Sequence, residues 1–256
     1  MNRRGFVKVS TSTAYHLLHP QPAVIVVSLD SKGKPSGMTA AWTSPISMDP
    51  PLISVSIAPR RYTYRLIKET GDFTINVLDV SLVAEAHFFG THSGRRVDKF
   101  AESGLTAERS LKVKSPHIKE ALAVLECNLH REIELGDHIL IVGEVLEAYV
   151  KPGMMKRGIY DPKVAKILMH LGGVGYVTVA DDDLLQLEDG KTVVMRARDW
   201  MRQAEKDLGH ARRSLDGGDY EWACFSAQQA AEKAVKALYE SIHVEVWGHS
   251  ISRMLA

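Results

Sequence analysis

The sequence predicts a mainly β domain followed by a C-terminal α-helical hairpin. Three observations support this fold class: strand-like segments joined by short turns, only brief helices between them, and a helical period that begins near Arg196. Strands connected in this way favour a closed or nearly closed antiparallel barrel over a doubly wound parallel sheet. The composition changes at an Asp-rich stretch, so we expect one domain over residues 1–185 and a second segment over residues 190–256.

Seven segments have the length and the residue types of β-strands. The first is continuous and β-branched, which predicts burial on both faces. The fifth alternates apolar residues with Glu126, Asn128 and Glu132, which predicts one wet face, and a turn at Gly136 makes it a long hairpin with the sixth. The predicted strands cover residues 23–29, 38–42, 52–57, 73–78, 125–134, 138–150 and 174–179.

Two short helices are expected between these strands. Residues 61–70 predict a helix that ends at Gly71, because glycine readily adopts the left-handed conformation of a helix C-terminus. Residues 81–89 predict another, with Ser81 as its N-cap and Gly90 as its end. Helices this brief leave the strands as the framework of the domain.

The C-terminal segment has a helical period instead. One apolar stripe runs from Trp200 to Leu215, and two glycines end that helix before Asp219, which is a favoured N-cap for the next. The second helix, residues 220–239, is expected to place its apolar groups inside. These inward positions are Trp222, Phe225, Ala230, Ala234, Val235 and Leu238. A two-helix hairpin buries little surface by itself, so this segment needs a partner.

Composition and charge exclude several classes of protein. The hydrophobic fraction is 45%, the charged fraction is 25%, and a formal net charge of +1 gives no overall field that would steer nucleic acid or an acidic membrane. No apolar run approaches the roughly 20 residues of a membrane helix, and no signal peptide is predicted. Cys127 and Cys224 fit no disulfide framework. We therefore expect a cytoplasmic protein without a membrane partner, and nucleic-acid binding is not expected.

The stretch from Gly37 to Phe100 carries the most informative pattern. A glycine and small residues precede Trp42, and such residues would let the backbone approach a planar ring. Donors that suit a phosphate follow at Arg60, Arg61, Thr63, Ser93 and Lys99. In order and spacing the series resembles the flavin reductase-like family, whose members fold as a split β-barrel and bind flavin mononucleotide (FMN) at a dimer interface.

This resemblance implies a set of cofactor-binding residues. Residues 38–43 would lie against the isoalloxazine and ribityl groups, and Asn76 would lie beside the ring. The predicted set is Met38, Thr39, Ala40, Ala41, Trp42, Thr43, Arg60, Thr63, Asn76, Ser93, Lys99 and His170. Backbone amides near the ring would stabilise negative charge that develops on it. No catalytic side chain is predicted, because the cofactor carries the chemistry and the protein orients it.

Closely spaced glycines over residues 170–176 do not match a dinucleotide-binding loop. Strand-like residues follow them, whereas the Gly-x-Gly-x-x-Gly fingerprint requires a helix. The glycines would instead let the chain pass close to the flavin, with His170 either a wall of the nicotinamide pocket or a structural histidine. None of the eleven histidines has metal-ligand spacing, so no metal site is predicted.

The C-terminal helices carry a second resemblance. Residues 199–200, 218–220 and 225–234 are similar to the opening half of a HEPN domain (higher eukaryote and prokaryote nucleotide-binding), which is a four-helix fold. The similarity covers about two helices and the approach to a third at residues 248–250. The Arg…His motif of the ribonuclease members has no counterpart here, so ribonuclease activity is not implied.

The predicted function is an FMN-binding, NAD(P)H-dependent flavin or ferric reductase that forms a homodimer. One alternative is a flavin-binding redox sensor whose output is the helical hairpin, and another is a nucleotide-binding protein led by that hairpin. Because a dimer would bring two hairpins into one particle, we expect them to pack together as a four-helix bundle. The electron acceptor and the choice between NADH and NADPH stay open.

Overall fold

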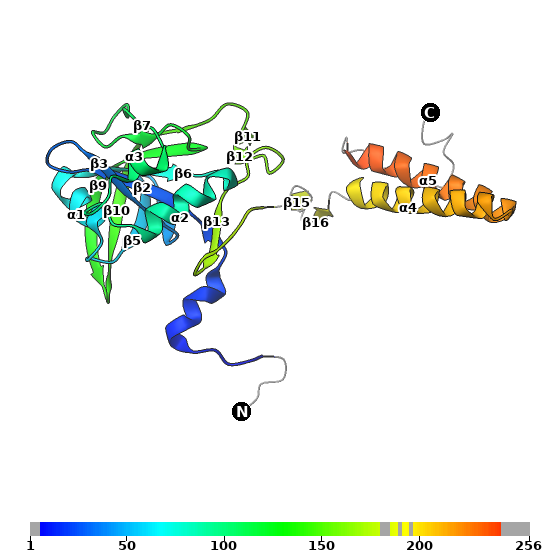
Figure 1. Cartoon of the computed structure of the whole chain (residues 1–256), viewed down its shortest axis with the longest axis horizontal. Helices are drawn as coiled ribbons and strands as arrows, with labels where there is room; N and C mark the ends of the chain where they lie inside the picture. Colours follow the sequence, from blue (N-terminus) through cyan, green and yellow to red (C-terminus); the bar gives the residue numbers. More distant parts are fainter. Residues whose placement is uncertain (1–5, 180–184, 189–190, 195–196, 242–256) are drawn as a thin grey trace. The chain divides into compact units, whose positions relative to one another are not determined.

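The computed structural model describes residues 6–179, 185–188, 191–194 and 197–241. The chain divides into two compact units, residues 1–179 and 180–256, and Figure 1 colours them from blue to light green and from yellow to red. The Asp-rich stretch behind the predicted boundary, residues 181–183, lies outside the described residues. The boundary at residue 185 therefore stays a prediction.

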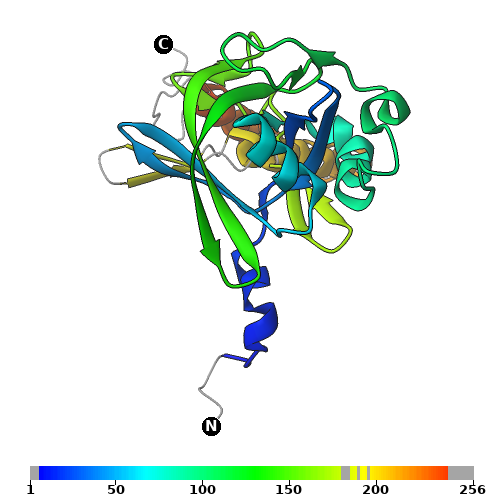
Figure 2. The same ribbon diagram turned by 90° about the vertical axis from the view of Figure 1, so that its left-hand side faces the viewer.

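A seven-stranded antiparallel sheet forms the framework of the first unit, in the order β3-β2-β6-β9-β10-β5-β4 (Figure 2). Its strands are β2 (Val24–Leu29), β3 (Pro35–Ala40), β4 (Thr43–Met48), β5 (Pro51–Ile57), β6 (Asp72–Val77), β9 (Ala123–Leu135) and β10 (His138–Val150). Only Ala41 and Trp42 separate the two edge strands β3 and β4 in the sequence. The sheet must therefore curl until its edges meet at this dipeptide, which is the closure expected of a barrel.

Most predicted strands are present, and β10 has the predicted bounds. Strand β4 is the one large strand that the sequence pattern missed. It lies at the sheet edge with mostly exposed residues and contains Pro45, which an edge strand tolerates because no partner needs its missing N–H. A hydrophobic pattern cannot reveal a strand that buries so little.

The smaller elements complete the first unit. The 3₁₀-helix η1 and strand β1 precede the large sheet, and β1, β13 and β14 form a three-stranded sheet of their own. The remaining pairs of short strands are hairpin-like. The bounds are η1 (Thr11–Leu18), β1 (Gln21–Pro22), β7 (Ala107–Glu108), β8 (His117–Ile118), β11 (Met155–Lys156), β12 (Ile159–Tyr160), β13 (Met169–Gly172) and β14 (Gly175–Val177), with β15 (Leu185–Glu188) and β16 (Lys191–Val194) in the second unit.

Strand β2 is buried on both faces, as predicted. Ile25 and Val27 belong to one core, which also contains Phe89, whereas Val24 and Val26 belong to a second core. Burying a large aliphatic side chain contributes about 1.5–3 kcal/mol, so two cores sharing one strand fix its position strongly. Strands β3 and β6, which are hydrogen-bonded to β2, are held in place with it.

Helix α1 (Tyr62–Thr70) ends as predicted, since Gly71 is left-handed with φ of 80°. The predicted limits of the next helix are wrong. Asp79, and not Ser81, accepts the capping hydrogen bond, which comes from the Ser81 N–H at 3.0 Å. The 3₁₀-helix η2 (Val80–Leu82) then leads into α2 (Val83–Thr91), and Gly90 lies inside that helix.

Helix α2 lies close to β3 at Gly90. A Cβ at this position would lie 3.4 Å from the Cβ of Thr39, which is an ordinary van der Waals contact. The Thr39 hydroxyl donates a hydrogen bond to the Ala86 carbonyl of the same helix. Strand β3 and α2 are therefore joined at two points. The short helix α3 (Lys99–Ser103) follows.

The wet face predicted for β9 is wrong at Glu126, which is fully buried. Its carboxylate accepts hydrogen bonds from the backbone N–H groups of Leu111, Lys112 and Val113 at 2.8, 2.6 and 3.3 Å. It also accepts one from the Tyr149 hydroxyl at 3.0 Å. Buried polar groups are normally hydrogen-bonded, and this carboxylate binds three successive N–H groups of the loop at residues 111–113.

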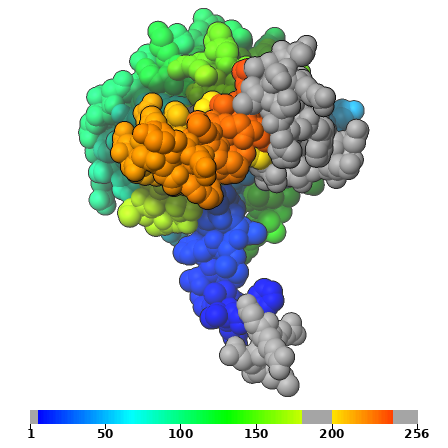
Figure 3. Space-filling model, turned by 90° about the vertical axis from the view of Figure 1, so that its right-hand side faces the viewer, coloured from blue at the N-terminus to red at the C-terminus, as the bar shows by residue number. Residues whose placement is uncertain are grey.

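The second unit contains α4 (Ala197–Asp216) and α5 (Tyr220–Ser241), which pack along their length. Figure 3 shows the surface of this hairpin in yellow-orange to red-orange. As predicted, Asp219 caps α5, accepting from the Trp222 N–H at 3.4 Å. Apart from Glu232, which is also buried, the buried seam consists of small residues: Ala204, Ala211, Ala223, Ser226, Ala230 and Ala237.

The inward orientation predicted for the largest side chains of α5 is wrong. Trp222 is 56% exposed, and Phe225 and Leu238 are each 54% exposed. An alanine seam lets two helices approach closely, and the wider side chains are then displaced to the flanks. The hairpin is thus held together by small residues and presents large apolar groups to solvent.

No helix among the described residues has both the length and the apolar character needed to cross a membrane.

Candidate functional site

Two adjoining cavities lie at the place where β3, β5 and α1 come together. One, the aromatic pocket, has a volume of about 260 Å³, and the other, the basic pocket, has a volume of about 190 Å³. Met38, Arg60 and Arg61 line both of them. A single elongated ligand could therefore occupy the two cavities together.

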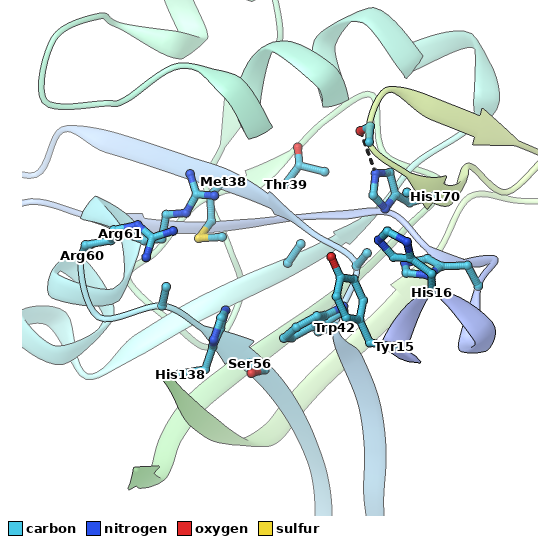
Figure 4. A pocket seen from close by; sticks show the side chains of 16 residues that line it. Tyr15, His16, Met38, Thr39, Trp42, Ser56, Arg60, Arg61, His138 and His170 are labelled. Atoms are coloured by element: carbon cyan, nitrogen blue, oxygen red, sulfur yellow. Dashed lines mark hydrogen bonds between the residues drawn. The ribbon is translucent and has the colours of Figure 1, made fainter. Parts of the chain in front are cut away.

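Rings form the walls of the aromatic pocket (Figure 4). Trp42, in the β3–β4 connection, contacts Tyr15 of η1 edge-on at a centroid distance of 5.3 Å. On another side it lies 5.0 Å from the His138 ring at the start of β10. The Ser56 N–H donates to the Trp42 carbonyl at 2.9 Å, which ties this connection to β5. The ring walls suit a planar ligand, and the histidines and arginines among the lining residues add polar groups around it.

The basic pocket is built from the first turn of α1 and the segment between α2 and α3. Its cationic side chains are Arg60, Arg61, Arg95 and Lys99, and Thr63, Thr91 and Ser93 add hydroxyl groups. No aspartate or glutamate is among the residues that line it. Arg61, Tyr62 and Thr63 also bring the N-terminus of α1 to the cavity, and free N–H groups at a helix N-terminus favour anions. The pocket is chemically an anion site.

Lys99 is the most unusual group of this pocket, because its side chain is only 3% exposed. Its ammonium donates to the carbonyls of Gly37 and Phe89, each at 2.7 Å. Burial, and then the nearby charge of Arg61, lower its pKa from the usual 10.5 to about 8. An ammonium has three protons, so two are used by the carbonyls and one is left for a ligand. A buried cation without a carboxylate is stabilised when an anion binds beside it.

Gly94 closes the basic pocket at a point where no side chain fits. A Cβ there would lie 2.1 Å from the Ser36 Oγ and 3.0 Å from the Tyr62 ring. The loop after α2 can therefore lie directly on β3 and α1, which brings its hydroxyl and cationic side chains into the cavity.

The structure brings most of the predicted site residues together. Met38, Thr39, Ala40, Ala41, Trp42, Arg60 and His170 line the aromatic pocket, and Met38, Arg60, Thr63, Ser93 and Lys99 line the basic pocket. Thr43 and Asn76 line neither. Their contacts with a ligand, and those of the other ten, stay predictions.

Asn76 is fully buried in the sheet, and its amide is used there. It donates to the Ile25 carbonyl and to the Thr74 hydroxyl, both at 3.0 Å, and it accepts from the Ile118 N–H at 2.7 Å. Its side chain therefore has a structural role, because it joins β6 to two neighbouring segments, and its expected place beside a bound ring stays a prediction. Thr43 pairs with Val55 in the β4–β5 ladder.

Gly37 also serves the fold. A Cβ at Gly37 would lie 2.8 Å from the Val26 carbonyl oxygen, so this glycine permits the close approach of β3 and β2. From the sequence alone, its small size suggested the approach of a ligand. The structure places that close approach between two strands.

His170 lies in the wall of the aromatic pocket and is also held by the protein. Its ring contacts His19 and Tyr176 edge-on, at centroid distances of 5.6 and 5.3 Å, and its Nε2 lies 3.2 Å from the Gly173 carbonyl oxygen. The two alternatives for this residue, a pocket wall and a structural contact, are thus compatible. Over the described part of the chain, no group of three or more His, Cys, Asp or Glu residues is arranged to hold a metal ion.

Sequence reasoning missed the pocket residues that come from distant segments. Tyr15, His16 and His19 arrive with η1, a helix without a single buried residue, and His138 arrives at the far end of the long hairpin. No hydrophobic period marks η1 as part of a site. Only their meeting in three dimensions reveals these contributions.

Comparison with known proteins connects this geometry to a family. The model of the flavin reductase like domain matches residues 16–170, and that of the HEPN domain matches residues 197–256. A relative from Archaeoglobus fulgidus is 43% identical over 129 residues, which are 50% of this chain and 72% of that protein. A flavin reductase of Pseudomonas putida is 31% identical over 157 residues, 61% of this chain and 83% of that enzyme.

Solved structures show the same fold. Flavoredoxin of Desulfovibrio vulgaris (Miyazaki F) superposes with a TM-score of 0.62 and 28% sequence identity, over 75% of this chain and 100% of flavoredoxin. The predicted fold, a split barrel followed by a helical hairpin, is confirmed.

Proposed function

Because the chain belongs to the flavin reductase like domain family, we propose that it binds FMN across the two pockets and acts as an NAD(P)H-dependent flavin or ferric reductase. The observation that carries this proposal is the buried Lys99 ammonium in a basic pocket free of carboxylates, directly joined to a pocket walled by rings. A phosphate and a flat ring connected by a flexible chain fit this pair of cavities. FMN has these three parts.

The pockets suggest how the chain would hold each part of FMN. Lys99, with Arg61 beside it, would bind the phosphate, and the N-terminus of α1 would add N–H donors. The isoalloxazine would lie in the aromatic pocket near Trp42. Strand β3 is a sheet edge, so every second residue there has a backbone N–H and C=O without a strand partner, and the Gly37 carbonyl already accepts from Lys99.

Bound flavin would supply the chemistry, since it can take a hydride from a reduced nicotinamide and pass electrons to an acceptor. The side chains of this chain would bind, orient and shield. Trp42, Tyr15 and His138 would exclude water from one side of the aromatic pocket through their mutual ring contacts. No side chain is proposed to transfer a proton.

The visible spectrum of the purified protein tests this function. The protein is expected to be yellow, or to become so with added FMN, and to lose that colour when NADH or NADPH is added without oxygen. A protein that binds no flavin would contradict the proposal. A flavoprotein that turns over reduced nicotinamide only very slowly would instead favour the redox sensor.

FMN affinity is expected to depend on pH through Lys99. The pKa of this group is about 8, so it is charged below that pH and neutral above it. The second pKa of a phosphate monoester is about 6, so the dianion and the ammonium coexist between roughly pH 6 and 8. FMN should therefore bind most tightly in that window and more weakly as the pH rises above 8. Fluorescence titrations with FMN and riboflavin would check this, and a dissociation constant for FMN that stays flat from pH 7 to 10 would contradict it.

The helical hairpin is proposed to be an interaction module in a homodimer. Phe225 and Trp222 contact each other edge-on at 5.7 Å, yet both are more than half exposed. Exposed apolar groups of this size usually mark an interface. Packing of two hairpins against each other would cover them.

Phe225→Asp is expected to disrupt this packing while the flavin spectrum stays the same, because a charge cannot enter an apolar contact without a large desolvation cost. Light scattering and the thermal melting of the helices would measure the effect, with Phe225→Leu as the matched control that keeps an apolar side chain. An unchanged oligomeric state and an unchanged melting temperature of the Phe225→Asp variant would exclude packing of the two hairpins against each other.

A further inference from the structure

The basic pocket has more positive charge than one phosphate requires. Arg60, Arg61, Arg95 and Lys99 all line it, whereas a phosphate monoester has a charge of about −1.5 to −2. Lys99 and Arg61, whose charges are near each other, match that anion. Among the described residues, no carboxylate lies within ion-pair distance of Arg60 or Arg95. The pKa of the Asp137 carboxyl is lowered mainly by its hydrogen bond with His138 and to a smaller extent by the charge of Arg60. Two guanidinium groups are therefore left over beside the proposed FMN phosphate.

These guanidinium groups belong to a patch centred on the Tyr62 ring. Arg95 lies over this ring at 5.2 Å from its centroid, and Arg65 does so at 4.9 Å. The Arg95 Nη1 also donates to the Arg60 carbonyl at 3.1 Å, which fixes the orientation of the guanidinium. We call Arg60, Tyr62, Arg65 and Arg95 the arginine patch.

The neutralisation of this patch within the protein is weak. Arg65 has a partner in Glu69, one helical turn away at 3.3 Å, but both side chains are about half exposed, and such pairs contribute little. Stacked arginines combine a flat face, which can lie against a purine, with a fork of donors that matches a phosphate. The patch thus has the chemistry to hold an adenine ring and a dianion.

The acids of this region bear on the choice between two nicotinamide donors: the basic pocket has none, and the acid that contacts the arginine patch, Glu69, is already paired with Arg65. In doubly wound dinucleotide-binding folds, an aspartate or glutamate binds the 2′-hydroxyl of the adenosine ribose in NADH, whereas an arginine accommodates the 2′-phosphate of NADPH. The same chemistry of charge would act on any fold. The residues that line the basic pocket include no such acid. They do include Arg60 and Arg95.

We propose that the arginine patch binds the adenosine 2′-phosphate of NADPH and makes NADPH the preferred hydride donor over NADH. The inference rests on the proposed function, because it names the donor of that reaction. It assigns Arg95 and Arg65 as specificity residues, and it separates them from Lys99, which holds the flavin phosphate.

Steady-state kinetics of the FMN-loaded protein test the assignment. The wild type is expected to have a kcat/KM at least about tenfold higher for NADPH than for NADH. Arg95→Ala and Arg65→Ala should each lower that ratio severalfold, at saturating FMN, and Arg95→Lys should restore part of it because it keeps the charge without the fork. Lys68→Ala is the matched control, since it removes an exposed cation from α1 outside both pockets, and its ratio should equal that of the wild type.

A binding measurement supplies a second readout that does not depend on turnover. Calorimetric titration of the FMN-loaded protein should show adenosine 2′,5′-bisphosphate binding at least about tenfold more tightly than adenosine 5′-monophosphate, with this difference lost in Arg95→Ala. Equal binding of the two nucleotides, or equal kcat/KM for NADPH and NADH, would overturn the inference while the flavin function stands. A protein that binds no FMN would overturn the proposed function itself.

Discussion

Replacing Lys99 with alanine is expected to weaken FMN binding by roughly 10- to 150-fold, which corresponds to the 1.5–3 kcal/mol of a charge-assisted hydrogen bond. Riboflavin, which lacks the phosphate, should lose much less. The buried ammonium donates two of its protons to the carbonyls of Gly37 and Phe89, so one proton is available to a ligand. Riboflavin has no phosphate oxygen to accept it. A phosphate oxygen would complete the coordination of the ammonium.

Two controls separate this ligand effect from a disturbance of the fold. Lys119→Ala removes a half-exposed lysine from the β7–β8 region outside both pockets and should leave both affinities unchanged. Urea unfolding of Lys99→Ala without flavin reports how much the two carbonyl contacts contribute to stability. Equal losses of FMN and riboflavin affinity would show that Lys99 acts on the shape of the site and does not bind the phosphate.

The large sheet could be predicted from the sequence wherever burial leaves a pattern. Strand β2 is apolar along its length because both of its faces are buried, and β10 is delimited by the turn at Gly136. Strand β4 has no such pattern, because it lies at the edge with its side chains in solvent. A local sequence pattern reveals a strand by the burial of its side chains. An exposed edge strand is recognised only by the hydrogen bonds to its neighbouring strand.

The prediction of the site from the sequence was limited in a similar way. The basic pocket could be anticipated because its donors come from two short stretches of the chain, around Arg60 and from Ser93 to Lys99. The aromatic pocket could be anticipated only in part, since Tyr15 and His138 reach it from segments far apart in sequence. Asn76 shows the converse limit, because a polar residue in a strand can serve the sheet as well as a ligand, and the sequence does not reveal the hydrogen bonds that its amide makes in the sheet.

The helical hairpin shows what a period alone leaves undetermined. A spacing of three and four residues identifies the apolar face of a helix. It does not show which residues of that face lie in the narrow contact between the two helices. Here the alanines occupy it, and Phe225 does not. The smallest residues of both helices set the distance between the helices, and that distance determines which side chains are buried between them.

Replacing Glu126 with alanine is expected to lower the free energy of unfolding by at least about 3 kcal/mol, one of the largest effects open to a single substitution outside the two pockets. Three backbone N–H groups of residues 111–113 and the Tyr149 hydroxyl would lose their acceptor at once. A buried donor left without a partner costs about 1–3 kcal/mol, although water can enter and recover part of that.

The size of the loss distinguishes this anchoring role from simple cavity formation. Glu126→Gln keeps the volume and one acceptor oxygen but turns an NH₂ group toward N–H donors, so it should lie between alanine and the wild type. Glu134→Ala is the matched control, because it removes an exposed carboxylate from the same strand and should change stability by less than about 0.5 kcal/mol. Urea denaturation followed by circular dichroism gives all three values. If Glu126→Ala and Glu134→Ala were equally stable, the loop would not depend on the buried carboxylate, and its shape would have to come from the second buried acid, Asp72, which accepts from the N–H groups of Lys114 and Ser115 at 3.1 and 3.0 Å.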